Sequence, residues 1–397
     1  MEIRSLTCFV DLTYPLQGSQ WETIARFASA ARRAFADAGY RVQSIRLATQ
    51  PFPEFAAGVE AFSLADVAVE VEAAAREAGV DYVSLGPAPG VQRAFGWHLA
   101  EEIPQAIAAT QGVFFGVTIA SPTLGMDTEG IRHAASLISQ VSRSVAHGFG
   151  NLRLAALANC APWSPFFPVA YHGGGAARFA VATEAADLAV QAFSQAGSPA
   201  QAEATLRSLV QTHADRIAET ARALAQELEM GFAGIDFSLA PYPVPERSIA
   251  KALEALTGDK FGARGTLFAA ALATRAVQSA EFPKTGFCGL FLPVLEDAVL
   301  AQRSRERTYS LDHLYLFSAV CGAGLDTVPL PGDVSREELE AILLDLAALS
   351  TRLSKPLTAR LMPIPGKRAG DITEFDFEYF ANAAILEVGG TAPRIGR

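Results

Sequence analysis

The sequence lacks paired cysteines, a basic stripe and a long apolar run, and each absence excludes a class of protein. Its four cysteines, Cys8, Cys160, Cys288 and Cys321, form no C-x-x-C pair, so we expect neither a zinc ribbon nor a thioredoxin-like redox site. The net charge is −10 and no lysine- or arginine-rich stripe could neutralise a phosphate backbone, which argues against nucleic acid as a partner. No uninterrupted apolar run reaches the roughly 18 to 20 residues that cross a bilayer, so no membrane partner is expected.

The amino end also lacks the features of a secretory signal. Residues 1–11 contain one early arginine, without a basic start followed by a small-residue cleavage site. We therefore expect a cytoplasmic protein, in which four free thiols are the default state. Half of the residues are hydrophobic and 19% are charged, so the chain can bury a large core.

Common catalytic motifs are missing as well. The sequence contains no G-x-x-x-x-G-K-S/T loop and no G-x-G-x-x-G that opens a helix after a strand, so it has no motif for ATP and none for NAD. His172 and the three glycines after it resemble a lipase oxyanion loop, but the G-x-S-x-G nucleophile elbow is absent. A serine hydrolase is therefore discounted.

Short β-rich runs alternate with Ala-rich helical patterns, which is typical of an α/β protein with parallel strands. The pattern predicts strands at 3–11, 41–48, 81–85, 112–119, 152–158, 234–239, 289–293, 326–330 and 357–362, with 383–388 as a candidate last strand. It predicts helices at 20–38, 64–78, 98–110, 130–147, 200–230, 248–257, 266–279, 311–321 and 335–353. With no composition shift between them, we expect one domain over residues 1–388 and a flexible tail over 389–397. The long helix at 200–230 is a packing surface or a subunit interface of a homo-oligomer.

Five segments combine ionisable side chains with proline or glycine in a way that ordinary core does not require. They are NCAPWSPFFPVAYHG at 159–173, GIDFSLAPYP at 234–243, GLFLPVLED at 289–297, VCGAGLDTVPLPGD at 320–333, and ARLMP at 359–363 with Gly370-Asp371 soon after. In this order they resemble the uncharacterised family labelled pyruvate-formate-lyase-like, over most of the chain up to residue 388. The resemblance implies a ten-stranded α/β barrel and an intracellular protein without established chemistry or a known substrate.

Glycyl-radical enzymes of that fold need a glycine in an R-V-x-G-Y/F loop near the carboxyl end and a cysteine on a central loop. Cys321 lies in a plausible loop, but residues 376–383 read DFEYFANA, without the glycine. Gly389 and Gly390 have flanking residues that do not match. We therefore expect no glycyl radical.

Asp236 and His172 are the leading candidates for acid–base work. A carboxylate inside an apolar strand must be paired, hydrogen-bonded or at the strand end, so Asp236 is either functional or a cap for the turn over 238–243. His172 can act as acid, base or metal ligand. The alternative is that its ring only bonds to the backbone.

The thiols and the remaining polar residues of these segments are weaker candidates. Cys160 and Cys321 are possible nucleophiles, with Cys160 the better candidate. Cys321 lies at the end of the predicted helix 311–321, where the dipole opposes a thiolate, so a structural role is favoured for it. Arg360 either binds a substrate carboxylate or pairs with an acid of the barrel. Within 159–173, Asn159, Trp163 and Tyr171 are expected to line the substrate pocket.

Three functional hypotheses remain open, and the sequence does not decide whether the protein is an enzyme. The first is acid–base chemistry on a small polar, carboxylate-bearing metabolite, with Asp236 or His172 moving the proton. The second adds a divalent metal held by His172, Asp236, Glu296 and Asp326, nitrogen and oxygen donors that suit Mg²⁺, Mn²⁺ or Zn²⁺. The third is a non-catalytic sensor of a small metabolite. The sequence implies no other cofactor.

Overall fold

The computed structural model describes residues 1–54, 62–90 and 97–390, and its framework is a sheet of ten strands in an α/β arrangement. The strand order is β8-β7-β1-β2-β3-β4-β6-β10-β9, and the short β5 pairs with β4 outside this path. The strands are β1 (Glu2–Phe9), β2 (Val42–Ala48), β3 (Tyr82–Ala88), β4 (Val113–Ser121), β5 (Gly125–Met126), β6 (Leu154–Ala158), β7 (Arg178–Glu184), β8 (Gly231–Asp236), β9 (Gly324–Pro331) and β10 (Leu357–Ile364).

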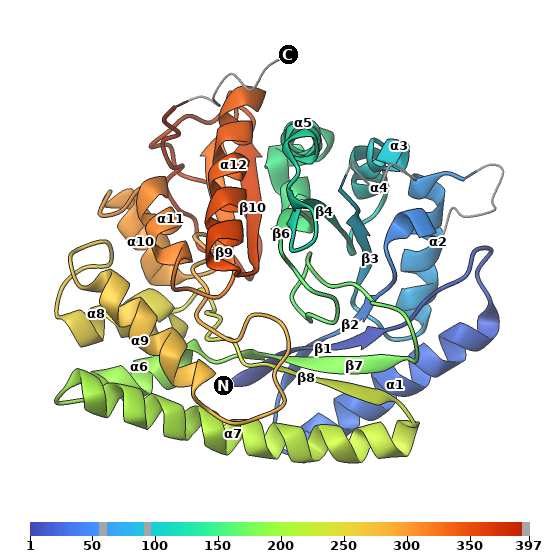
Figure 1. Cartoon of the computed structure of the whole chain (residues 1–397), viewed down its shortest axis with the longest axis horizontal. Helices are drawn as coiled ribbons and strands as arrows, with labels where there is room; N and C mark the ends of the chain where they lie inside the picture. Colours follow the sequence, from blue (N-terminus) through green and yellow to red (C-terminus); the bar gives the residue numbers. More distant parts are fainter. Residues whose placement is uncertain (55–61, 91–96, 391–397) are drawn as a thin grey trace.

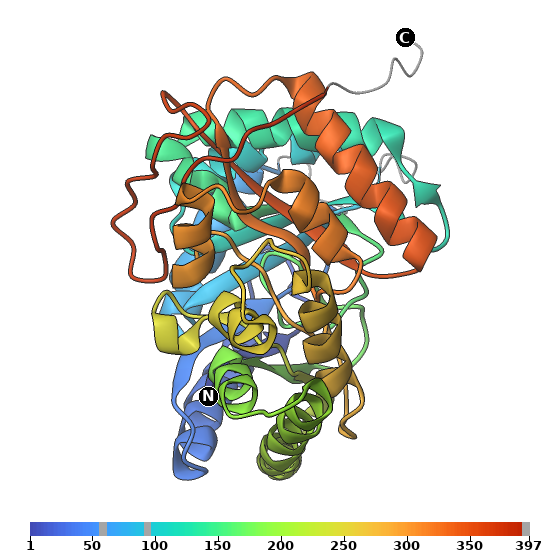
Figure 2. The same cartoon turned by 90° about the vertical axis from the view of Figure 1, so that its left-hand side faces the viewer.

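Helices surround this sheet on its outer side, as the two views of Figures 1 and 2 show. They are α1 (Gly18–Asp37), α2 (Leu64–Glu77), α3 (Trp97–Ala100), α4 (Ile103–Ala109), α5 (Thr128–Ser144), α6 (Ala186–Ser194), α7 (Pro199–Leu228), α8 (Ile249–Thr257), α9 (Thr266–Gln278), α10 (Ala298–Arg305), α11 (Leu311–Ser318) and α12 (Arg336–Leu353). Single 3₁₀ turns or short 3₁₀ segments occur at Phe52–Glu54, Ala146–Arg153 and Pro245–Arg247. Among the described residues, no helix combines the length and apolarity that a membrane span requires.

The strands run in two groups of opposite direction. β1, β2, β3, β4 and β6 are parallel neighbours. β7 and β8 form a parallel pair, as do β9 and β10. The junctions between the groups, β1 with β7 and β6 with β10, are antiparallel. β8 and β9 are left as the two edges of the sheet.

The segment of residues 283–294 lies between these two edges. The N–H of Ile235 in β8 donates to the carbonyl of Pro283 at 2.8 Å, and the N–H of Val294 donates to the carbonyl of Asp326 in β9 at 3.1 Å. These contacts form isolated parallel bridges and no continuous ladder. Regular strand pairing therefore does not close the sheet, although one segment bonds to both of its edges.

Gly234 in β8 permits the close approach of this segment. Its φ is +129°, and a Cβ at this position would lie 2.9 Å from the carbonyl oxygen of Pro283, so a side chain would collide with the backbone. The strand expected at 289–293 belongs to this segment and is not regular. Two prolines near the ends of the segment 283–294, Pro283 and Pro293, have no N–H to donate to a ladder.

Strand residues alternate between an outer and an inner face of the sheet. In β2, Ile45 and Leu47 pack in the main hydrophobic core under the helices, whereas Ala48 packs in a separate cluster with Phe167. Ser44 and Arg46 share the face of Ala48 because they precede it by four and two residues. The inner face therefore carries small and polar side chains.

The loop of residues 159–173 packs against this inner face. The hydroxyl of Thr7 donates to the carbonyl of Pro165 at 3.4 Å, and the hydroxyl of Ser84 donates to that of Ala170 at 2.7 Å. Both hydroxyl-bearing residues are fully buried. The small polar side chains of the sheet thus leave room for the loop and satisfy its carbonyl groups.

The structure departs from the sequence-based expectation at further places. β5, β7, α6 and α10 were not predicted, and β7 is held by antiparallel pairing with β1. Residues 383–388 form no strand, because Ala384 makes only an isolated bridge to Ile372. The long helix is confirmed as α7, which begins after the N-cap Ser198. Most of the tail predicted at 389–397 lies outside the described residues, which end at 390.

Candidate functional site

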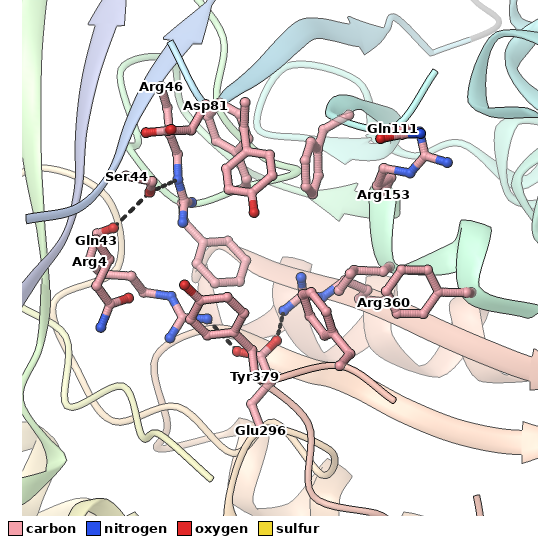
Figure 3. Close-up of a pocket in the computed structure, with 17 residues that line it drawn as sticks. Arg4, Gln43, Ser44, Arg46, Asp81, Gln111, Arg153, Glu296, Arg360 and Tyr379 are labelled. Carbon is pink, nitrogen blue, oxygen red and sulfur yellow. Dashed lines mark hydrogen bonds and ion pairs between the residues drawn. The ribbon is translucent and has the colours of Figure 1, made fainter. Parts of the chain in front are cut away.

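A pocket of about 340 Å³ lies between the two groups of strands, a volume at the lower end of small-molecule sites. Four arginines line it, Arg4 from β1, Arg46 from β2, Arg360 from β10 and Arg153, and we call it the arginine pocket. Glu296, which follows the segment 283–294, and Tyr379 line it as well. Figure 3 shows these side chains converging.

Irregular strand pairing contributes to this convergence. The register of β1 against β7 shifts at Arg4, which is an extra residue there. The register of β9 against β10 shifts opposite Arg360, where Thr327 has a φ of 41°. Such a φ is strained for a β-branched residue. Bulges of this kind redirect side chains, and here they occur on both walls of the pocket.

Glu296 joins two of the arginines. Its carboxylate accepts a hydrogen bond from Arg360 Nη2 at 2.8 Å and another from Arg4. Arg360 also pairs with Asp326, at 2.6 Å. Burial favours the neutral form of Glu296, but Arg4 and Arg360 outweigh it and hold its pKa below the ordinary value. Burial raises the pKa of Asp326, and Arg360 offsets that rise only in part.

Arg46 differs from the other two, because it forms no ion pair with any carboxylate in the part of the chain that the structure describes. Its Nε donates to Ser44 Oγ at 2.9 Å. Its guanidinium lies 5.8 Å from the ring centroid of Tyr82 and 5.0 Å from that of Phe167. Burial and the charge of Arg4 lower the pKa of Arg46 to about 10, so it is a cation at neutral pH.

Arg153 lines the pocket on the side away from Arg4, next to Gln111 (Figure 3). Its guanidinium donates to the carbonyls of Ile107 and Thr110, each at 2.8 Å. Burial lowers the pKa of Arg153 to about 10. These carbonyls end α4, so Arg153 serves as the C-terminal cap of that helix.

Comparison with known proteins places the chain in a family. Residues 1–378 match the family described as Uncharacterised ACR (DUF711). The chain belongs to this family. Similar proteins carry the name UPF0210, among them one from Pyrobaculum arsenaticum that is 33% identical over 93% of this chain and 86% of its own length. Another, UPF0210 protein NMA1908 from Neisseria meningitidis, is 29% identical over 85% of this chain and 77% of its own length. These names state no reaction.

In this UPF0210 family member, the structure brings together part of the predicted site. Glu296 and Arg360 line the arginine pocket, and Asp326 bonds to Arg360 from the adjacent strand. The predicted pairing of Arg360 with an acid of the sheet is therefore present, and its binding to a substrate carboxylate stays a prediction. Arg360 has donors at the pocket wall while its guanidinium pairs with Asp326 and Glu296.

The structure does not bring His172 and Asp236 together. His172 Nδ1 lies 2.6 Å from Asp11 Oδ1, just beyond the C-terminal end of β1, and its buried Nε2 has no hydrogen-bond partner among the described residues. Asp236 Oδ1 accepts from the Ser238 hydroxyl at 2.6 Å and from the Cys288 N–H at 2.9 Å. Asp236 in β8 pairs with Ala182 of β7, and Ala182 pairs with Ser5 of β1, so Asp236 lies near the N-terminal half of β1. Neither residue lines the arginine pocket.

The four predicted metal ligands are likewise spread over three places. His172 pairs with Asp11, Asp236 with Ser238, and both Glu296 and Asp326 with Arg360. Within the described residues, no group of three or more His, Cys, Asp or Glu side chains is arranged to hold a metal. The residues present therefore do not fit the divalent metal of the second hypothesis.

The predicted residues of the loop 159–173 anchor it. Asn159 Nδ2 donates to Ser350 Oγ at 2.9 Å, and the Tyr171 hydroxyl donates to the carbonyl of Cys160 at 3.1 Å. The Trp163 ring lies 4.6 Å from the guanidinium of Arg178. None of these four loop residues lines the arginine pocket.

The two candidate thiols lie in different surroundings. Burial raises the pKa of the Cys160 thiol to about 12, and its Sγ contacts the carbonyl of Leu357 at 3.5 Å. Cys321 is 1% exposed, and its carbonyl accepts from Lys355 Nζ, which also donates to the carbonyl of Ser318. Among the described residues, no cation contributes to the pKa of Cys160, whereas Lys355 interacts electrostatically with Cys321.

Sequence reasoning missed Arg4, Arg46, Tyr82 and Tyr379. The signal for two of them is present, because Arg4 and Arg46 interrupt apolar strands, as Asp236 does. A charge inside such a strand needs a partner or a cavity. Tyr379 has no comparable signal, since only the fold brings residues near the carboxyl end to this pocket.

Proposed function

We propose that this protein binds a small carboxylate-bearing metabolite in the arginine pocket and acts on it by acid–base chemistry. The observation that carries the proposal is Arg46, a partly buried cation with no ion pair among the described residues. A desolvated charge is stabilised when a counter-ion neutralises it. A carboxylate suits the position, because it accepts two parallel N–H bonds from a planar guanidinium.

Proton transfer on such a ligand would fall to Glu296 and Tyr379, which line the pocket, and not to His172 or Asp236. Glu296 is ionised and would accept a proton from a carbon next to a carbonyl or carboxylate group. Arg46 would stabilise the negative charge left on the ligand. Burial and the neighbouring Glu378 raise the pKa of Tyr379 to about 12, so its hydroxyl stays protonated and can return a proton.

A metabolite sensor is the second candidate, and the bonding of Glu296 favours it. Two arginines hold this carboxylate and lower its pKa, which makes Glu296 a weak base. A pocket that binds a carboxylate without a stronger base would recognise the ligand and leave it unchanged.

Thermal unfolding tests the binding step. The wild-type protein, Arg46→Met and the control Arg222→Met are heated with millimolar pyruvate or benzoate; Arg222 is exposed on α7, outside the pocket. A ligand at 100 times its Kd stabilises a protein by about 2.7 kcal/mol, so a rise in Tm is expected for the wild type and Arg222→Met. Arg46→Met should lose the rise. If neither carboxylate shifts the wild-type Tm, or if Arg46→Met responds like the control, the proposal is wrong.

Hydrogen exchange in the ligand separates the two candidate functions. Pyruvate is incubated with the protein in D₂O, and loss of its methyl proton signal is followed by NMR. Exchange that Arg46→Met abolishes supports acid–base catalysis. Binding without exchange above the rate of free pyruvate supports the sensor.

We also propose that the sheet is the ten-stranded barrel that the sequence resemblance implies. Support comes from the two oppositely directed parallel groups and from the bridges that residues 283–294 make to both edge strands. An experimental structure in which this segment contacts only one edge would contradict the barrel.

A further inference from the structure

Two separate groups of aromatic rings line the arginine pocket, and Phe166, which packs against Phe287 and Phe291, lines it beside Arg360. In the first, Tyr82 and Phe114 are 5.6 Å apart between ring centroids, and Phe114 and Phe167 are 5.3 Å apart. These rings come from β3, β4 and the loop 159–173. All three line the pocket.

The second group comes from segments far away in the sequence. Phe149, in the 3₁₀ segment Ala146–Arg153, lies 5.2 Å from Phe377, and Phe377 lies 5.3 Å from Tyr379. All three are partly exposed, and all three line the same pocket. Among the described residues, no ring pair within contact distance joins this group to the first. Each group therefore presents apolar surface to the pocket space without covering that of the other.

The cation borders the first aromatic group. Arg46 lies against the rings of Tyr82 and Phe167, so an anionic group bound to Arg46 has its attached carbon skeleton beside these rings. On the far side, both terminal nitrogens of Arg153 are used by carbonyls at the end of α4. Among the described residues that line the pocket, Arg46 is thus the arginine whose guanidinium neither pairs with a carboxylate nor caps a helix.

We infer that the ligand is a monocarboxylate that carries an aromatic ring, bound with the carboxylate at Arg46 and the ring between the two aromatic groups. This inference rests on the proposed function and specifies its substrate class. Aromatic rings attract one another in edge-to-face or offset geometry at 4.5 to 7 Å between centroids, so rings on both sides recognise a third ring better than an aliphatic body. A dicarboxylate would place its second charge where no free cation is available.

Calorimetric titration with five probes tests the inference on the whole protein. The probes are 3-phenylpropanoate, 3-cyclohexylpropanoate, propanoate, 3-phenylpropan-1-ol and 3-(4-carboxyphenyl)propanoate. We expect 3-phenylpropanoate to bind most tightly, by about tenfold over the cyclohexyl analogue if ring contacts contribute near the upper end of their usual 0.5 to 1.5 kcal/mol. Propanoate should bind more weakly still.

Two variants locate the effect. Phe377→Leu should lower the preference for 3-phenylpropanoate over 3-cyclohexylpropanoate and leave propanoate binding unchanged. The control Phe268→Leu alters a ring that is 54% exposed on α9 and outside the pocket, and it should change neither. Far-ultraviolet circular dichroism checks that both variants are folded.

The outcomes separate this inference from the proposed function. Equal, Arg46-dependent affinity for propanoate and 3-phenylpropanoate would overturn the aromatic ligand and leave carboxylate binding intact. Tighter binding of the dicarboxylate would also overturn the inference, because it would require a second cation. Equal binding of the alcohol and 3-phenylpropanoate would contradict the proposed function, because the carboxylate would then contribute nothing, but it would still support a ring bound between the two aromatic groups. If no probe binds, both are wrong.

Discussion

Glu296 and Arg360 form an ion pair of 2.8 Å in which each side chain is only 5% exposed. The two residues are far apart in the sequence, and the pair connects the end of the segment 283–294 to β10. Arg4 bonds to the other carboxylate oxygen, so Glu296 also connects β10 to β1. A single carboxylate thus ties together both groups of strands at the pocket.

Replacing Glu296 with Gln should destabilise the protein strongly. The amide keeps the shape but removes the charge that neutralises Arg4 and Arg360, and loss of one partner of a buried pair typically costs about 3 to 5 kcal/mol. Urea unfolding measures the change. The control Glu203→Gln removes a pair with Arg275 that lies at the surface, where solvent screens the interaction, so its effect should be small. Equal effects of the two variants on the free energy of unfolding would contradict the stabilising role of the Glu296 ion pairs.

Asp236 should make stability depend on pH in a predictable direction. Burial raises the pKa of Asp236 in the fold, and the bonds from Ser238 and Cys288 offset this only in part. A carboxyl with a raised folded-state pKa favours the fold fully below its unfolded-state pKa, and this contribution is lost as pH rises through the folded-state value. Asn at position 236 does not titrate, so the stability of the wild type relative to Asp236→Asn should fall as pH rises from about 4.

Urea unfolding of both proteins at a series of pH values measures this difference. Other groups titrate equally in the two proteins and cancel. A difference that rises with pH would mean that Asp236 is ionised and paired in the fold, which would return it to the list of functional acids.

Cys160 should be inert towards alkylation in the folded protein. A pKa of about 12 leaves about a thousandfold less thiolate at pH 8 than an ordinary cysteine has. Iodoacetamide labelling followed by mass spectrometry should therefore modify Cys160 slowly in the folded state and rapidly in urea. Cys160→Ala should also keep the carboxylate-induced rise in Tm. Fast labelling of the folded protein would restore Cys160 as a candidate nucleophile.

Local pattern was enough to predict much of the framework. Alternation of apolar runs with Ala-rich segments indicated most strands and helices, including α7. An element that buries one face has apolar residues spaced at the helix or strand period, and this spacing is visible in the sequence. β7 escaped detection because its pairing with β1 is a contact between distant segments. The residues 383–388 have strand-like composition, but within the described residues their bridge pairing is limited to Ile372 with Ala384, and towards β9 the N–H of Leu386 donates to the carbonyl of Pro329. Composition alone does not reveal this.

For the site, the sequence by itself determined that Arg360, Glu296 and Asp326 are charged residues in apolar surroundings that need partners. It could not decide which residues meet, because ion pairs and ring contacts form between positions that the chain brings together only on folding. Tertiary structure placed Arg360 between Glu296 and Asp326, and it separated His172 from Asp236 by pairing them with Asp11 and Ser238. Within the described residues, it alone left Arg46 without a carboxylate partner, since the two acids that line the pocket, Asp81 and Glu296, already pair with other arginines.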